Sequence, residues 1–186
     1  MTNKALRIGV DLILIILGII FLVFGIKDLN SMIHANDKTD AELMSSEYMY
    51  LSKENVYEYI TFKNLTKLLY ESGSGMVLIG SPQSPWTQVL VSPLNIIAKE
   101  ENIKIYYIDI NDVDINYDTK DVNKAPVLKD YDVPKVFFVK DGEILGEYKK
   151  EDLYDKNYDG IPLEYWTEEK LEMLNETMKN EIAKIK

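Results

Sequence analysis

The stretch from Met76 to Leu94 constrains the fold of this chain more than any other. It begins as a short apolar run, Met76–Ile79, breaks at Gly80 and the polar residues after it, and becomes apolar-periodic again from Val89. A short apolar run bounded by turn residues is typical of a buried strand, and an apolar period of about 3.6 residues is typical of a helix. The stretch therefore predicts a buried strand, a tight turn and a helix.

The start of this helix is well marked. Ser84 is a favourable N-cap, because its hydroxyl can accept a hydrogen bond from a free backbone N–H, and Pro85 at the first helical position loses no hydrogen bond. We expect a helix over 84–99, kinked at Pro93 because proline removes one backbone hydrogen bond. A strand that delivers a polar turn onto a helix N-terminus is a common place for chemistry.

Other patterns predict the remaining elements of the folded part. Asp141-Gly142 is a strong hairpin turn, and Thr167 followed by two glutamates is a good helix start. The expected strands are Val56–Ile60, Ile103–Ile110, Pro134–Val139 and Ile144–Tyr148. The expected helices are one from Phe62 that closes at Gly73, the helix after Ser84, and Glu168–Ile185 with Leu171, Leu174, Met178, Ile182 and Ile185 on one face.

The turn itself resembles that of a known family. Residues 80–88 read Gly-Ser-Pro-Gln-Ser-Pro-Trp-Thr-Gln. They resemble the Gly-x-Pro-x-Cys-Pro-x-Cys-Gln turn of bacterial membrane-anchored thioredoxin-like proteins, including those called bacteriocin-transport accessory proteins. Ser84 stands where the attacking cysteine would be and Thr87 where the resolving cysteine would be. The chain contains no cysteine at all.

A second segment carries the same resemblance. Val133-Pro134, before the predicted strand, is similar to the family's region in which a cis-proline faces the active-site turn. The resemblance implies a cis Val133–Pro134 bond and an α/β thioredoxin-like fold, a central mixed sheet flanked by helices. The chain departs from the family at Lys135, where threonine is usual, and at Pro93, which lies one residue further from the turn.

The missing cysteines remove the family's activity. Thiol–disulfide exchange needs a thiolate, whose pKa the helix N-terminus lowers, and a hydroxyl forms no disulfide. We therefore expect no catalytic residue and no cofactor, with Ser84 and Thr87 as degenerate positions. What the resemblance leaves is a groove for an extended polypeptide, made by Ser84, Pro85, Trp86, Thr87, Val133 and Pro134. Within it, Trp86 has two open interpretations: an exposed contact for a client chain, or a core residue packed beside the helix.

Residues 8–26 form an apolar run of about 19 residues, which at about 1.5 Å per residue spans the roughly 30 Å core of a bilayer. Lys4 and Arg7 precede the run, so the positive-inside rule places the N-terminus in the cytoplasm. A cleaved signal peptide is the alternative, but the run is long and no convincing cleavage site follows it. We expect a single-pass cell-membrane protein.

The expected domain organisation follows from this. Residues 1–7 are a short cytoplasmic segment, 8–26 a transmembrane signal anchor, 27–55 a polar spacer with one helical stretch at 41–51, and 56–186 an extracytoplasmic thioredoxin-like domain. The net charge of −10 and the sequence pI of about 4.7 argue against a nucleic-acid partner, because phosphate binding needs clustered cations. The expected partners are the membrane, through 8–26, and an extended polypeptide or a protein of a membrane complex.

One acidic stretch resembles half of a calcium loop. Asp155, Asn157 and Asp159 match the first half of an EF-hand loop, but its twelfth position is Trp166 instead of a bidentate glutamate. They form a weak calcium candidate, and a loop rich in turn residues explains the spacing equally well. The only histidine, His34, has no cysteine or second histidine beside it, so we expect no other metal site.

Three functions compete at this point. The first is an accessory or peptide-binding module without redox activity. The second is a structural subunit of a membrane complex. The third is a thiol–disulfide oxidoreductase family member seen as a cysteine-free variant, with Ser84 and Thr87 as substitutions; the threonine favours a natural loss, since serine or alanine is the usual engineered replacement.

Overall fold

The structure is a computed structural model that describes residues 38–112 and 132–186. Within it, Asp40–Lys186 forms one compact unit. The predicted membrane span at 8–26 lies outside the described residues, and none of the helices within them is long and apolar enough to cross a bilayer.

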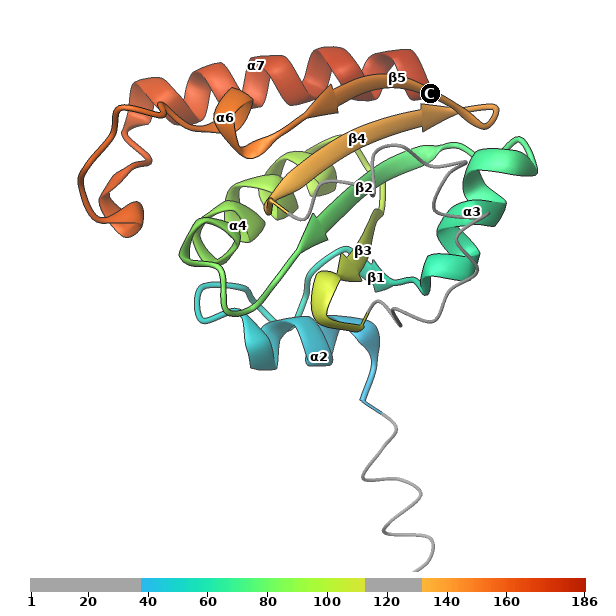
Figure 1. The fold of residues 1–186 in the computed structure, drawn as a ribbon, viewed down its shortest axis with the longest axis horizontal. Coiled ribbons are helices and arrows are strands. Elements are labelled where there is room, and N and C mark those ends of the chain that lie inside the picture. Colours follow the sequence, from blue (N-terminus) through green and yellow to red (C-terminus); the bar gives the residue numbers. More distant parts are fainter. Residues whose placement is uncertain (1–37, 113–131) are drawn as a thin grey trace, which may run out of the picture. The chain divides into compact units, whose positions relative to one another are not determined.

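The centre of the unit is a mixed sheet of five strands in the order β1-β3-β2-β4-β5 (Figure 1). β1 and β2 run parallel to β3, β4 is antiparallel to β2, and β5 is antiparallel to β4. The hairpin turns at Asp141 and Gly142, whose φ values of 52° and 82° are those that this turn requires. The strands are β1 (Tyr57–Tyr59), β2 (Gly75–Gly80), β3 (Ile105–Asp109), β4 (Lys135–Lys140) and β5 (Glu143–Tyr148).

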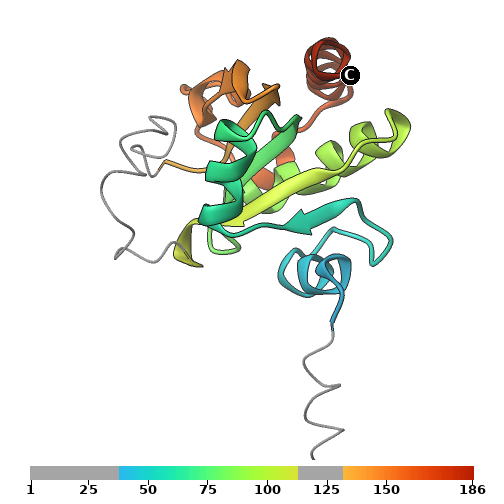
Figure 2. The same ribbon diagram turned by 90° about the vertical axis from the view of Figure 1, so that its right-hand side faces the viewer.

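Helices cover both faces of the sheet. Figure 2 shows α3 on one side of the sheet and α4 and α7 on the other. Two shorter helices, α2 and α6, precede β1 and follow β5. The α-helices are α2 (Asp40–Glu47), α3 (Phe62–Tyr70), α4 (Pro85–Glu100), α6 (Lys150–Leu153) and α7 (Glu168–Ile185), with 3-10 turns η1 (Ile110–Asp112) and η3 (Pro162–Glu164).

Alternation along the strands divides the core between the two faces. Val77 and Phe137 point to the α3 side, where they join Phe62 and Leu65. Leu78 and Phe138 point to the side of α4 and α7 and join the larger cluster. Because β2 and β4 are buried on both faces, they read in the sequence as unbroken apolar runs.

The α/β thioredoxin-like arrangement expected from the sequence is confirmed for the described residues. The strand order, the flanking helices and the cis Val133–Pro134 bond before β4 are all as expected. The predicted helix after Ser84 is α4, with Ser84 as its N-cap, and it continues through Pro93 as one helix. Leu171 differs from the expectation: it belongs to the predicted apolar face of α7 but is 37% exposed.

The compact unit begins at Asp40, whereas the sequence analysis placed the end of the spacer at residue 55. Met44 of α2 and Tyr48 after it are fully buried. The Tyr48 hydroxyl lies 2.6 Å from the Tyr107 hydroxyl of β3, and Asn55 donates a hydrogen bond to the Ala41 carbonyl. Residues 40–55 therefore belong to the folded domain. The eight residues of α2 are mostly polar, which is why the sequence pattern there is weak.

Candidate functional site

The turn between β2 and α4 is fixed by its own side chains. The Ser84 hydroxyl accepts a hydrogen bond from the Thr87 N–H at 3.2 Å, which is the capping bond expected from the sequence. The Ser84 N–H donates to the Ser81 carbonyl, and the Ser81 hydroxyl accepts from the Gln83 N–H. The backbone at the start of α4 is thus held in one conformation without any disulfide.

The structure brings this turn against the cis-proline segment. The Ser84 Oγ lies 3.5 Å from the Val133 carbonyl oxygen, at the long limit of a hydrogen bond. Pairing of β4 with β2 begins at Lys135, so the Val133 peptide lies outside the sheet ladder. The two segments that carry the family resemblance, 49 residues apart, therefore meet at one place.

The six residues of the predicted groove differ in accessibility. Pro85 is exposed, and Ser84, Trp86 and Val133 are half-buried. Thr87 and Pro134 are buried. A bound chain can therefore touch the first four directly, while Thr87 and Pro134 shape the surface from below.

Thr87 is a packing residue in this site. Its side chain is fully buried, and among the described residues its Oγ1 has no hydrogen-bond partner. Its methyl group faces Gly80, where an added Cβ would lie 2.6 Å from the Thr87 Cγ2. A buried hydroxyl of this kind offers neither a nucleophile nor a contact to solvent. Thr87, at the position of the resolving cysteine, therefore contributes packing to the site.

Trp86 packs against aromatic residues that the sequence analysis did not connect to the turn. Its ring centroid lies 4.2 Å from that of Tyr154 and 5.5 Å from that of Tyr165. The Tyr154 hydroxyl also donates a hydrogen bond to the Trp86 carbonyl at 2.8 Å. Trp86 is thus half core and half surface, between the two interpretations left open above. The signal in the sequence is the density of aromatic residues in 154–166, which surround the acidic loop at 155–159.

A groove of about 290 Å³ runs beside the exposed part of Trp86, and we call it the Trp86 groove. Its wall includes Asp132, the neighbour of Val133, so the groove adjoins the cis-proline segment. Lys150 pairs with Asp132 at 3.5 Å at its edge. The lining residues are Trp86, Asp132, Lys150, Glu151, Tyr154, Asp155, Lys156 and Tyr158. Aromatic walls with charges of both signs suit a polypeptide better than a single anion or cation.

Burial keeps the Tyr154 hydroxyl in the wall of the Trp86 groove protonated. Desolvation raises the pKa of the Tyr154 hydroxyl above its ordinary value, with the nearby Tyr165 as the next contribution. The neutral phenol is then the only form present near neutral pH. Tyr154 therefore acts as a hydrogen-bond donor to the Trp86 carbonyl and cannot serve as a base.

The calcium candidate forms an ordinary turn. Asp155 accepts a hydrogen bond from the Asn157 N–H through its carboxylate, and the Asp155 N–H donates to the Tyr165 hydroxyl. Asp159 is exposed and forms no hydrogen bond with Asp155 or Asn157. Within residues 38–112 and 132–186, no three carboxylate, histidine or cysteine side chains gather in a way that could hold a metal ion.

No protein-family model and no curated protein matches this chain. Among solved structures it is similar to thioredoxin O2 from Arabidopsis thaliana, at 13% identity and a TM-score of 0.43, over 68% of this chain and 94% of that one. It is also similar to a thioredoxin from Trypanosoma brucei brucei, at 14% identity and a TM-score of 0.43, over 68% and 91%. The thioredoxin-like arrangement of this chain is given by its own strand order, flanking helices and cis Val133–Pro134 bond.

Proposed function

We propose that this chain is a redox-inactive thioredoxin-fold binding module that holds an extended polypeptide against the α4 turn and the Val133–Pro134 peptide. The observation that carries the proposal is the position of Val133. Its peptide lies outside the sheet ladder, its carbonyl is 3.5 Å from the Ser84 Oγ, and the preceding residue, Asp132, lines the Trp86 groove.

Strand-like pairing is the recognition mode that this geometry supports. Backbone groups next to a strand but outside its ladder can pair with an extended chain, which gives affinity without sequence selectivity. Selectivity then comes from side-chain pockets, and the Trp86 groove supplies one with an aromatic wall. Its lining carries three acids and two lysines, and Lys150 is paired with Asp132, so the groove favours a polar client residue of neither charge in particular at that position.

Catalysis is not part of the proposal. The chain has no cysteine, so thiol–disulfide exchange has no nucleophile. Ser84 is engaged as a helix cap, and a serine nucleophile also needs an adjacent base. The only histidine of the chain, His34, lies outside the described residues. Binding is the function that the remaining features of the site can perform.

We place the module on the outer surface of a cell membrane, anchored by residues 8–26. The support is the length and apolarity of that run and the positive residues before it. Such an anchor would hold the domain near proteins that cross the same membrane. A structural subunit of a membrane complex is the second candidate, and it is favoured by the large apolar side chains that the domain exposes, such as Met49.

A peptide-library screen against the full chain tests the binding proposal. The library should be unstructured and displayed so that each peptide can extend. Hydrogen–deuterium exchange with a selected peptide should slow at Val133 and at the amides around Ser84–Trp86. Protection confined to other parts of the domain, or a library that yields no binder, would contradict the proposal.

A further inference from the structure

A second groove borders the α4 turn and shares no lining residue with the Trp86 groove. It has a volume of about 570 Å³ and lies between the end of α2 with the loop after it, the start of α4, and η3. Its apolar lining is Met49, Tyr50, Pro85, Val89, Ile161, Pro162 and Leu163. We call it the Met49 groove.

Large apolar side chains are unusually exposed here. Met49 is 81% exposed and Leu163 is 54% exposed, with Tyr50 and Ile161 also open to solvent. Of the nine exposed large hydrophobic residues in the described part of the chain, these four line one groove, and they come from segments more than 100 residues apart. Scattered exposed residues are ordinary, but a gathered patch marks an interaction site.

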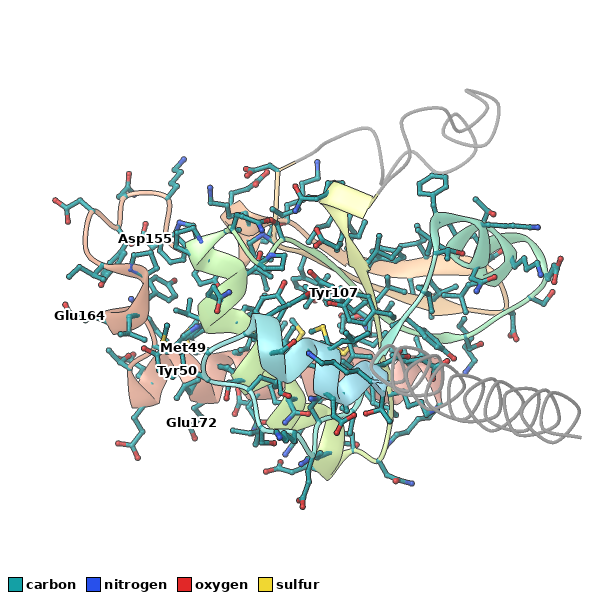
Figure 3. The ribbon with its side chains drawn as sticks, turned by 90° about the horizontal axis from the view of Figure 1, so that it is seen from below. Met49, Tyr50, Tyr107, Asp155, Glu164 and Glu172 are labelled. Atoms are coloured by element: carbon teal, nitrogen blue, oxygen red, sulfur yellow. The ribbon has the colours of Figure 1, made fainter. Side chains whose placement is uncertain are left out.

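The charges around the Met49 groove indicate the charge of the partner that it binds. The lining contains one acid, Glu47, and no basic residue. Glu164, next to Leu163, is exposed, and Figure 3 shows it at the same end of the domain as Met49 and Tyr50. With a net charge of −10 on the chain, an anionic lipid surface or an acidic protein is disfavoured and a cationic partner is favoured.

The elements that form the Met49 groove also indicate what kind of ligand it binds. All of its lining residues come from helices and loops, so the groove offers no strand edge with which an extended chain could pair. Its apolar residues stand mostly in solvent and do not enclose a cavity, whereas sites for small molecules bury most of the ligand. Side chains entering from an amphipathic helix, at i, i+3 or i+4 and i+7, fit such a surface.

We propose that the Met49 groove binds an amphipathic helix of a partner protein, with apolar residues in the groove and cationic residues beside Glu47 and Glu164. The site is separate from the Trp86 groove in its residues and in its recognition mode. It meets the polypeptide site proposed at the α4 turn and Val133–Pro134 only at Pro85, which also lines the Met49 groove.

The absence of cysteine makes a direct binding measurement possible. A single Ser46→Cys substitution places one thiol at the exposed rim of the groove, where a polarity-sensitive dye reports occupancy. The probe is a synthetic helix of about five turns with leucines on one face and lysines on the other. The full chain is studied in nanodiscs of zwitterionic lipid, with empty nanodiscs as the reference. Asn64→Cys, exposed on α3, carries the dye in the control protein.

The proposal predicts a saturable shift of dye emission at position 46 and none at position 64. Leu163→Ser should weaken binding about tenfold, as expected for removal of one buried anchor. Leu145→Ser, at a leucine that is 44% exposed on β5, should leave it unchanged. The same helix with glutamates in place of lysines should bind at least about tenfold more weakly, because its charges face Glu47 and Glu164.

Three results would overturn the proposal. The first is equal binding by the Leu163→Ser and Leu145→Ser proteins, which would place the helix elsewhere. The second is a shift in the emission of the dye at position 46 in nanodiscs before any peptide is added. That shift would show that the Met49 groove contacts the lipid surface. The third is a shift that grows with protein concentration alone and is lost in Leu163→Ser, which would make the occupant a second copy of the chain.

Discussion

The hydroxyl of Tyr48 lies 2.6 Å from the hydroxyl of Tyr107, and both side chains are fully buried. This contact joins the segment before the first strand to the centre of the sheet, 59 residues later in the chain. Their rings also meet edge to face at 5.8 Å. A buried hydroxyl pair of this kind is stabilising only while both members are present.

Tyr107→Phe should therefore destabilise the domain by about 1–2 kcal/mol, because it leaves the Tyr48 hydroxyl buried without a partner. Tyr48→Phe should have a similar cost. The loss in the free energy of unfolding of the double variant should be smaller than the sum of the losses of the two single variants. Urea denaturation of the four proteins measures this cycle. Additive losses would show that the two hydroxyls are not coupled.

The same tyrosines predict how stability depends on pH. Burial is the largest cause that raises the pKa values of Tyr48, Tyr57 and Tyr107 above the ordinary value of about 10. Above pH 10 the unfolded chain loses these protons while the folded chain keeps them, so this contribution to stability is complete below pH 10 and declines as the pH rises. Tyrosinate absorbance should show a cooperative step that coincides with loss of circular dichroism. Complete titration of the tyrosines in a domain that stays folded would contradict this.

The parts of the fold that depend on residues close together in the chain could be predicted from the sequence. Ser84 and Thr167 are predicted as N-caps, and each accepts a hydrogen bond from the backbone N–H of the third residue of its helix. Asp141-Gly142 was predicted as the hairpin turn because its backbone conformation suits glycine and aspartate. In each case the determining chemistry lies within a few residues.

The parts that the sequence did not reveal depend on distant contacts. A helical stretch at 41–51 is expected, but not its place in the folded domain, because that depends on the contact of Tyr48 with Tyr107. Trp86 could not be assigned because its partner Tyr154 lies 68 residues away. Leu171 has the helical spacing of a core residue, but it borders a groove with Pro93 and Ile96 of α4. No pattern along the chain encodes these long-range pairings.

Thr87→Val tests whether Thr87 has only a packing role. Valine keeps the shape of threonine and removes a buried hydroxyl that has no partner within the described residues, so the free energy of unfolding should stay unchanged or rise by up to about 1 kcal/mol. Thr61→Val is the matched control. Thr61 caps α3 through its hydroxyl, and its loss should cost about 1 kcal/mol. A marked loss of stability in Thr87→Val would indicate a polar role that the geometry does not explain.

The double variant Ser84→Cys with Thr87→Cys tests whether the turn keeps the geometry of a redox site. A thiol at position 84 lies at the N-terminus of α4, so its pKa should fall below the ordinary value of about 8.5. The rate of alkylation against pH measures it. Ser46→Cys in the last turn of α2 is the control, because the helix dipole there acts in the opposite sense. Equal pKa values at the two positions would show that the α4 turn no longer activates a thiol.

Site-specific photocrosslinking in the native cell tests the central claim most directly. The crosslinker is placed at Lys156, which is exposed and lines the Trp86 groove, and in the control at Lys63, which is exposed on α3. We expect a discrete adduct at Lys156 that is missing at Lys63, with the captured segment of the partner identified by mass spectrometry as an extended stretch. An absence of adducts at Lys156 above the Lys63 control, in cells where the protein migrates in a larger complex, would contradict the claim that this groove binds a polypeptide.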